Sequence, residues 1–186
     1  MIVNWPTVLL SPEGGSLSSA FVDRGLRTFA TAVDRVHQLP YGRGPNRADW
    51  RTVLTLGRGT CSTKHALIAA LARECQVPVS LMMGIYMMDE HNTPGIESAL
   101  VPSPFEALPE AHCYLVYQSQ RIDLTMPGIV KSPPEMIIEQ TIQSDQIGED
   151  KVLFHKAFVQ QWPSTHALDV DEVWRVREQC IAALSF

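Results

Sequence analysis

Three residues in this sequence have the types and the order that nucleophilic acyl chemistry requires. Cys61 opens the segment CSTKHALIAALARE directly after GRGT, and His112 and Asp123 lie farther along in AHCYLVYQSQRIDLT. A cysteine is a nucleophile only as its thiolate, with an unperturbed pKa of about 8.5, and an imidazole oriented by a carboxylate can hold or relay its proton. The set therefore predicts a catalytic triad of Cys61, His112 and Asp123.

The segment after Cys61 has the composition of a buried helix. Alanine and leucine side chains recur along it, which predicts a helix from Cys61 to Cys75. The first turn of a helix presents unpaired N–H groups and the positive end of the helix dipole, and both stabilise a thiolate. Gly57 and Gly59 are expected to leave room for a carbonyl substrate, so that Gly59 and Thr60 would border that substrate.

Two later segments are typical of a β-hairpin. The runs AHCYLVYQ and RIDLT are rich in branched and aromatic residues, and SQ between them can turn the chain. Antiparallel pairing would bring His112 and Asp123 to the same end of the hairpin. Because neighbouring strand residues point to opposite faces, Cys113 is expected to point away from His112 into the core.

The predicted elements run in the order helices, strands, helices. A helix is expected over residues 19–39, where Pro40 ends it, and a short one in ADWRTVLTL. The run VSLMMGIYMM is typical of a buried strand before the hairpin. SPPEMIIEQ predicts another helix start with Ser132 as N-cap, and a last helix is expected after Asp169. This order predicts an α+β fold.

The length of 186 residues suits one domain with a sizeable core. We interpret residues 1–186 as a single domain with a core over about 19–127 and a C-terminal helical extension over about 131–186. Residues 89–110 are too long for a hairpin turn and lead directly to His112. This segment is either a plain surface connection or a lid over the acyl-donor site.

Composition and charge limit the classes of partner. Hydrophobic residues make up 45% and charged residues 19% of the chain, as in globular proteins, and the net charge of -5 argues against nucleic acid and against a membrane as main partners. No apolar run reaches the ~18–20 residues that span a bilayer, and the N-terminus lacks the basic region of a signal peptide. The four cysteines form no C-x-x-C pair. These features predict reduced cysteines and a cytoplasmic location.

Several of these segments together resemble a known family. GRGTCSTKHALIAALARECQVPVSLMMGIY, AHCYLVY and IDLT are similar to the transglutaminase-like core of the papain-like cysteine fold, over roughly residues 47–127. The resemblance implies a helical lobe packed on an antiparallel sheet, with Cys61 as nucleophile, His112 as general base and Asp123 as the orienting carboxylate. It also implies that Trp50 donates its indole N–H to an oxyanion, although a core or lid role is the simpler interpretation.

The sequence departs from the family pattern at several positions between the three residues. Gln76 stands where the family has Gly, Ser80 where it has Arg, and Leu124 where it has Pro; Cys113 and Tyr114 replace Ala-Trp. None of these changes removes a member of the triad. They leave the class of substrate open.

A metal site is the main alternative use of these residues. Cys61 and His65 are four apart on one helix face, and with His112 and Cys113 they could be imagined around zinc. Alternation along the strand opposes this, because His112 and Cys113 cannot easily face one metal. We therefore predict no metal and no cofactor, and we expect Lys64 and His65 to be solvated helix residues. The histidines expected at the surface are His37, His91, His155 and His166.

The function that these features predict is acyl transfer or amide hydrolysis through a Cys61 thioester, with a protein or peptide as substrate. Water as acceptor makes a peptidase or deamidase, and a lysine amine makes a cross-linker. The competing interpretation is a non-catalytic domain that keeps the triad and binds a peptide or protein partner. Acyl transfer from coenzyme A, as in arylamine acetyltransferases, is a third, but the sequence shows no basic phosphate-binding patch. Calcium dependence and oligomeric state stay open.

Overall fold

The computed structural model describes residues 2–128, 130–162 and 169–184. The helices before the sheet are α1 (Ser16–Val22), α2 (Phe29–His37), α3 (Val53–Leu56) and α4 (Cys61–Glu74). The strands are β1 (Ser80–Met88), β2 (Leu108–Tyr117), β3 (Gln120–Ile122) and β4 (Ile138–Ile142). The remaining helices are α5 (Glu97–Leu100), α6 (Glu149–Gln161) and α7 (Val170–Ala183). Short 3-10 turns are η1 (Pro12–Gly14), η2 (Trp50–Thr52) and η3 (Ser144–Ile147).

The four strands form one antiparallel sheet in the order β3-β2-β1-β4. Strand β2 has a neighbour on each side, and its register with β1 places His112 opposite Gly84. Gln118 and Ser119 join β2 to β3 and both have positive φ angles, of 48° and 63°. A two-residue turn with both residues in this left-handed region matches the twist of the paired strands. The predicted hairpin and the predicted α+β class are confirmed, although the turn lies one residue earlier than the expected turn at Ser119 and Gln120.

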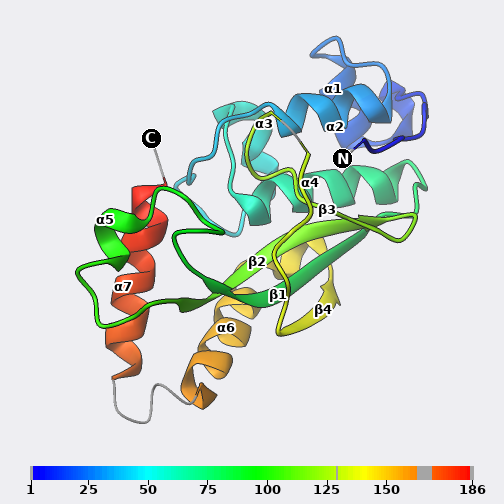
Figure 1. The fold of residues 1–186 in the computed structure, drawn as a ribbon. Coiled ribbons are helices and arrows are strands. Elements are labelled where there is room, and N and C mark those ends of the chain that lie inside the picture. The colour runs from blue at the N-terminus through cyan, green and yellow to red at the C-terminus, as the bar shows by residue number, and fades with distance from the viewer. Residues whose placement is uncertain (1, 129, 163–168, 185–186) are drawn as a thin grey trace.

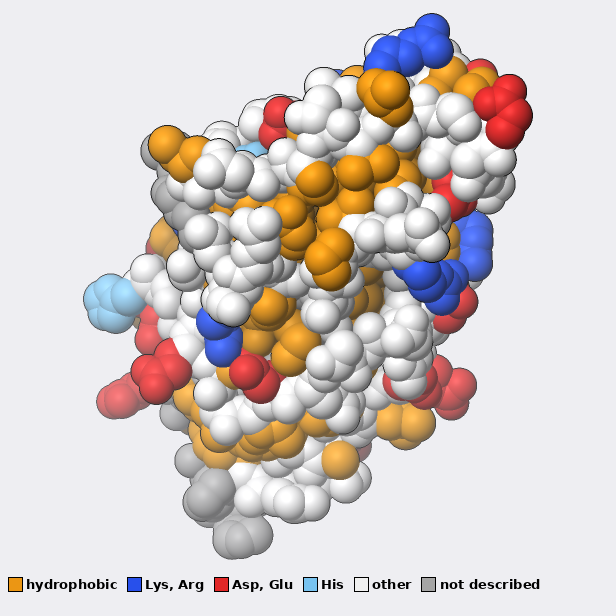
Figure 2. Space-filling model, turned by 90° about the vertical axis from the view of Figure 1, so that its right-hand side faces the viewer, with side chains coloured by type: hydrophobic (Ala, Val, Ile, Leu, Met, Phe, Trp, Pro, Cys, Tyr) orange, Lys and Arg blue, Asp and Glu red, His pale blue; other side chains and the backbone are white. Residues whose placement is uncertain are grey.

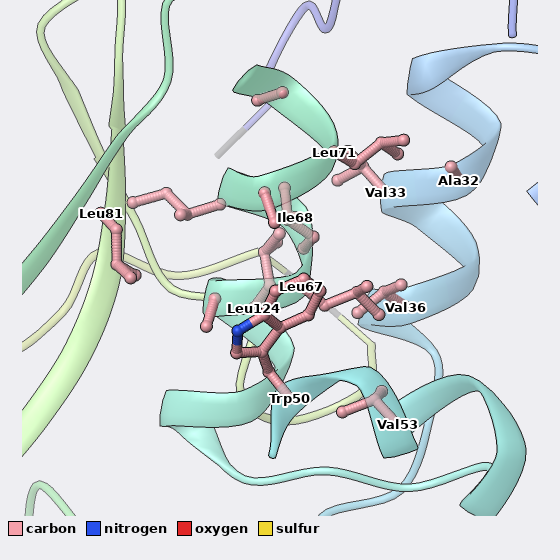
Figure 3. Packing of buried hydrophobic residues seen from close by; sticks show 14 of the residues in the cluster. Ala32, Val33, Val36, Trp50, Val53, Leu67, Ile68, Leu71, Leu81 and Leu124 are labelled. Carbon is pink, nitrogen blue, oxygen red and sulfur yellow. The ribbon is translucent and has the colours of Figure 1, made fainter. Parts of the chain in front are cut away.

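Helix α4 runs through the main hydrophobic core and packs on the sheet and on the N-terminal helices. Leu67, Ile68 and Leu71 are fully buried and lie between Val33 of α2 and Leu81 of β1 (Figure 3). Almost every residue of α4 from Ser62 to Ala72 is buried. Burial on nearly all sides fixes the helix axis, and with it the position of the residue at its N-terminus.

A second cluster joins the start of β2 to the C-terminal helices. Leu108 of β2 and Tyr86 of β1 pack with Val173 and Val176 of α7, and Phe105 from the preceding segment joins them. Helices α5 and α7 lie side by side at this end of the molecule, away from α1 and α2 (Figure 1). The chain after the sheet therefore folds back onto the strand that carries His112.

The single helix predicted over residues 19–39 is wrong, because the structure has two. Helix α1 ends before Gly25, whose φ of 79° is in the left-handed region, and α2 begins after Thr28. The Thr28 side chain accepts a hydrogen bond from the Thr31 N–H and forms a capping box with it. Leu26 still packs against the core. The apolar spacing therefore continues through the break and conceals it.

The helix predicted to start at Ser132 is also wrong. Residues 133–136 form no regular element, and β4 follows as an edge strand on β1. The Ile137 N–H donates to the Ile85 carbonyl at 2.7 Å, so that β1 gains a partner on its open side. The pairing satisfies backbone groups that a helix start would satisfy locally, and consecutive isoleucines favour a strand. The region after residue 131 is thus not wholly helical.

The face that carries the N-terminal helices has a mixed surface. Hydrophobic side chains interrupt the polar surface in several places, and charged side chains of both signs are scattered over the face (Figure 2). No helix in the described ranges has the length and apolar character needed to cross a membrane. This face thus carries no extended field of one sign.

Candidate active site

Cys61 is the first residue of α4, and its position is fixed by a capping box. The Thr60 side chain accepts from the Thr63 N–H at 3.4 Å, and the Thr63 hydroxyl accepts from the Thr60 N–H at 2.9 Å. These bonds satisfy Thr63 but leave the N–H groups of Cys61 and Ser62 without a hydrogen-bond acceptor among the described residues. Free N–H groups beside a thiolate stabilise it, and they can also bind an oxygen that gains negative charge.

Gly59 has a different role from the predicted one. A Cβ there would lie 2.7 Å from Lys64 Cγ and 2.9 Å from Thr63 Oγ1, so the space beside it is already filled by protein. Gly59 forms a parallel bridge with Tyr41, in which its N–H donates to the Pro40 carbonyl. The glycine therefore allows a close packing of backbone on α4 and leaves no opening for substrate.

His112 and Asp123 come together as the hairpin predicts. His112 Nε2 lies 2.9 Å from Asp123 Oδ2, which leaves His112 Nδ1 for the thiol of Cys61. The other carboxylate oxygen of Asp123 accepts from the Thr125 N–H at 2.9 Å and from its hydroxyl at 2.5 Å. A bridge between Asp123 and Lys131 holds the backbone just after β3. Asp123 thus has both oxygens engaged and a fixed orientation.

Opposite charges hold Cys61 and His112 as an ion pair. Burial opposes ionisation of the Cys61 thiol, but the ammonium of Lys151 and the charge and hydrogen bonding of His112 outweigh it and lower the thiol pKa to about 6. Burial also opposes a charged His112, whereas Asp123 and the Cys61 thiolate raise the imidazole pKa well above its usual value. At neutral pH the sulfur is therefore a thiolate and His112 an imidazolium.

Lys151 is a site residue that the sequence analysis missed. It comes from α6, and its Nζ lies 4.0 Å from Cys61 Sγ and donates to Ser62 Oγ at 2.9 Å. Burial opposes its charge, but Cys61, Cys113 and Glu110 raise the pKa of its ammonium above the usual value. A lysine ninety residues after the cysteine carries no local signal, since its place depends on how α6 packs.

Lys64 and His65 are buried, so the prediction that they are solvated is wrong. Lys64 Nζ donates to the carbonyls of His37, Leu39 and Thr125 at 2.8–3.0 Å. Burial lowers the pKa of this ammonium to about 8, and the three carbonyls surround it. The helix is enclosed on nearly every side, and a polar side chain is tolerated there because its donors are satisfied.

His65 connects the nucleophile to the loop after Asp123. Its Nδ1 donates to the Cys61 carbonyl at 2.7 Å, and its Nε2 accepts from the Leu124 N–H at 2.8 Å. A carbonyl can only accept and an N–H can only donate, so His65 is the neutral Nδ1–H tautomer. Burial lowers its pKa to about 4. Both ring nitrogens are occupied by the backbone, and neither is available to a zinc ion.

The other described histidines include both exposed and buried residues. His91 is exposed, as expected, and His166 lies outside the described residues. His37 and His155 are buried, contrary to the prediction. His155 Nε2 donates to the Pro109 carbonyl at 2.7 Å, and burial lowers the His155 pKa to about 4. His155 thereby fixes α6 against the start of β2.

A small cavity of about 70 Å³ opens beside the sulfur. Its walls include Thr60, as predicted, together with Cys61, Tyr41 and Ile147. Side chains of α6 and α7 form much of the rest: Lys151, Val152, His155, Trp174, Arg177 and Ile181. Of the segment 89–110, only Glu110 is in its lining. The C-terminal helix pair thus covers the cavity, whereas the segment 89–110, for which a surface connection and a lid were both considered, packs against α7.

Tyr41 is among the residues that line this cavity. It is buried, with 9% of the residue exposed, and no described residue forms a hydrogen bond with its hydroxyl. Burial, and the negative charges of Cys61 and Glu110, raise its pKa well above the usual value. The hydroxyl therefore stays protonated and can donate a hydrogen bond.

Trp50 is not brought to the cavity. Its indole N–H donates to Asp145 Oδ1 at 3.1 Å, and its ring packs in the core against α4 (Figure 3). The oxyanion role considered for Trp50 therefore has no geometric support, and the core role is the one observed. Cys113 is buried in the core, as expected; Cys180 is buried as well, and Cys75 is partly buried at the end of α4.

Comparison with protein families gives one match. The pattern of the transglutaminase-like superfamily matches residues 20–118, just over half of the chain. The chain therefore belongs to the transglutaminase-like superfamily. The matched range contains Cys61 and His112, whereas Asp123, Lys151 and the helices that cover the cavity lie beyond it. Comparison with curated proteins and with solved structures gives no match.

Proposed function

We propose that the domain catalyses acyl transfer or amide hydrolysis through a thioester on Cys61. The observation that carries this proposal is the environment of the sulfur. Cys61 lies at a helix N-terminus, its thiol pKa is lowered to about 6, and the imidazole beside it is oriented by Asp123 at 2.9 Å. A packing cysteine has no need of a lowered pKa, whereas a nucleophile does.

The chemistry follows from the charges. The Cys61 thiolate attacks the carbonyl carbon of the donor, and the electrons of the C=O bond move to its oxygen. The N–H groups of Cys61 and Ser62 and the Tyr41 hydroxyl are the available donors to that oxygen. The His112 imidazolium then gives its proton to the leaving amine as the C–N bond breaks. A thioester and a neutral imidazole are left.

The second half of the cycle regenerates the enzyme. Neutral His112 takes a proton from the acceptor, which is water in hydrolysis and an amine in transamidation. The acceptor attacks the thioester, the C–S bond breaks, and the thiolate returns. Asp123 holds the ring in one orientation and stabilises the imidazolium in both halves.

The test is acylation by p-nitrophenyl acetate, followed by release of nitrophenolate and by intact mass. We expect an acetyl group on Cys61, and a rate that rises with pH around a midpoint near 6, because the thiolate is the attacking species. His112→Ala should slow release of the acetyl group about 10²–10⁴-fold, because its general base is lost, and move the midpoint for acylation toward that of an ordinary thiol. His91→Ala, at an exposed histidine, is the matched control and should change neither.

The competing function is a domain that binds a peptide or protein partner without turnover. Equal acylation of Cys61 and Cys75 in the native protein, with no effect of His112→Ala, would favour that function and contradict ours. A reactive Cys61 that forms a stable acetyl adduct but does not release it would keep the first half of the cycle. It would also point to an amine acceptor in place of water.

A further inference from the structure

Cationic side chains gather around the cavity from segments far apart in the sequence. Arg43 and Arg47 come from the loop before η2, Lys151 from α6 and Arg177 from α7, and all four are among the residues that line it. The whole chain has a net charge of -5. The cavity is therefore a basic site in an acidic protein, which the sequence analysis did not foresee.

Two carboxylates near these cations are already committed to arginines. Glu110 binds Arg177 through both of its oxygens, at 2.5 and 2.6 Å. Glu178 meets Arg43 at 2.9 Å, Arg177 at 2.6 Å and Arg47 at 3.9 Å. Two carboxylates thus face three guanidinium groups, and Arg47 has only a long contact.

Lys151 has no carboxylate within ion-pair distance among the residues that the structure describes. Its Nζ donates one hydrogen bond, to Ser62 Oγ, and its nearest anion is the Cys61 sulfur at 4.0 Å. An ammonium has three donor hydrogens, and a half-buried one without an anionic partner is unfavourable. Thioester formation would remove the thiolate charge and leave Lys151 without its nearest anion.

We propose that this cavity binds a carboxylate carried by the acyl donor, close to the carbonyl that Cys61 attacks. The inference rests on the proposed function and names its class of substrate. The carboxylate would take the place of the thiolate as the partner of Lys151, with Arg47 at the exposed mouth of the cavity. The cavity volume of about 70 Å³ is several times the ~10–15 Å³ that one bound water requires. This size suits a carboxylate.

The experiment compares two alkylating reagents of similar size, iodoacetate, which is anionic, and iodoacetamide, which is neutral. Both react with the same thiolate, so the ratio of their rates at Cys61 does not depend on the thiol pKa. We expect this ratio to exceed that of glutathione by about tenfold or more, the lower end of the usual effect of a charged cleft. A ratio equal to that of glutathione would overturn the proposal.

Variants show which cation is responsible. Lys151→Gln should remove most of the preference for iodoacetate, and Lys151→Arg should retain it because the charge is kept. Lys156→Gln, at an exposed lysine of the same helix, is the matched control and should leave the ratio unchanged. A preference that survives Lys151→Gln would contradict the assignment. Circular dichroism and thermal unfolding of each variant exclude a loss of fold.

A second arm separates this inference from the proposed function. Two p-nitrophenyl esters are compared that differ only in a terminal carboxylate or the corresponding primary amide. Faster acylation of Cys61 by the carboxylate ester supports the inference. Equal rates overturn the inference and leave the thioester mechanism standing. If neither ester acylates Cys61, the proposed function fails, and the proposal about its substrate fails with it.

Discussion

Cys61 is bordered by the hairpin of β2 and β3 and by helices α6 and α7, and the two regions are built differently. The hairpin supplies His112 and Asp123, which are eleven residues apart and joined by a two-residue turn. The helix pair supplies Lys151 and Arg177 through long-range packing, and the family match ends before it. The positions of His112 and Asp123 are therefore determined by a local hairpin, whereas the positions of the cations that cover the site depend on tertiary packing.

This difference separates the residues that would carry out the reaction from those that would select the substrate. Cys61 and His112 belong to the part of the chain that the superfamily pattern matches, and in the proposed mechanism they are the nucleophile and the base. Of the four cations that would select a donor, Lys151 and Arg177 come from α6 and α7, beyond the matched range, whereas Arg43 and Arg47 come from the loop before η2, within it. A fold and its reactive residues can be shared while the substrate is chosen by what is added around them.

The first prediction concerns the buried ion pair that attaches α7 to β2. Glu110 and Arg177 are 4% and 7% exposed and form a bidentate ion pair. Arg177→Met should lower the free energy of unfolding by about 3–5 kcal/mol, because it leaves a buried carboxylate unpaired. Urea unfolding followed by circular dichroism measures the change.

Two further variants make that result specific. The double variant Glu110→Leu with Arg177→Met should recover most of the loss, since no buried charge is left unpaired. Arg175→Met, on the same helix, removes an exposed pair with Glu172 and should change the stability by no more than about 0.5 kcal/mol. A small effect of Arg177→Met would mean that α7 is only loosely attached, and that the cover opens readily.

The sequence was sufficient for the part of the molecule whose signals are local. The start of α4, a tight turn between β2 and β3, and the α+β order follow from spacing and residue type, although the turn lies one residue before the expected Ser119 and Gln120. The break between α1 and α2 and the strand β4 were missed. In the first, Leu26 keeps the apolar period across the break, and in the second the edge of β1 overrides the local preference.

In the site, too, the residues placed by local structure could be predicted and those placed by tertiary packing could not. His112 and Asp123 could be predicted because a hairpin fixes their separation, and Thr60 because it precedes the helix. Lys151 could not, because no pattern in the sequence says that α6 returns to the N-terminus of α4. Lys64 and His65 were placed in solvent because charged and polar residues are usually exposed, and their backbone partners appear only in the folded chain.

The pH dependence of stability tests the buried connection between the two regions. His65 has its pKa lowered to about 4 by burial, and His155 of α6 is lowered to about 4 for the same reason. Above pH 6.5 both are neutral in the folded and the unfolded chain. Between pH 6.5 and about 4 only the unfolded chain binds the protons, so the free energy of unfolding should fall as the pH falls. The loss is about 3 kcal/mol for each histidine.

Urea unfolding at pH 7.5 and at pH 4 measures this slope. His65→Gln should make it shallower, because the amide can donate to the Cys61 carbonyl and accept from the Leu124 N–H but does not titrate. His91→Gln, at an exposed histidine, should leave the slope as it is. Parallel curves for His65→Gln and the native protein would show that the buried imidazole is not the source of the acid sensitivity.

The sequence and the structure indicate different residues as the hydrogen-bond donor to the oxyanion. The resemblance to the superfamily points to Trp50, whereas in the structure the Trp50 N–H binds Asp145 and Tyr41 is among the residues that line the cavity. Tyr41→Phe should slow acylation by p-nitrophenyl acetate by about 10²-fold, the usual loss for one such donor. Alkylation by iodoacetamide forms no oxyanion and should proceed nearly as before.

Trp50→Phe is the matching variant for the other candidate donor. It should lower stability modestly, since it removes one hydrogen bond. It should change the rate of acylation by less than about twofold, far below the loss of a donor to the oxyanion. If Trp50→Phe slows acylation selectively and Tyr41→Phe does not, the donor is the one that the resemblance implies, and the indole must leave Asp145 when a substrate binds.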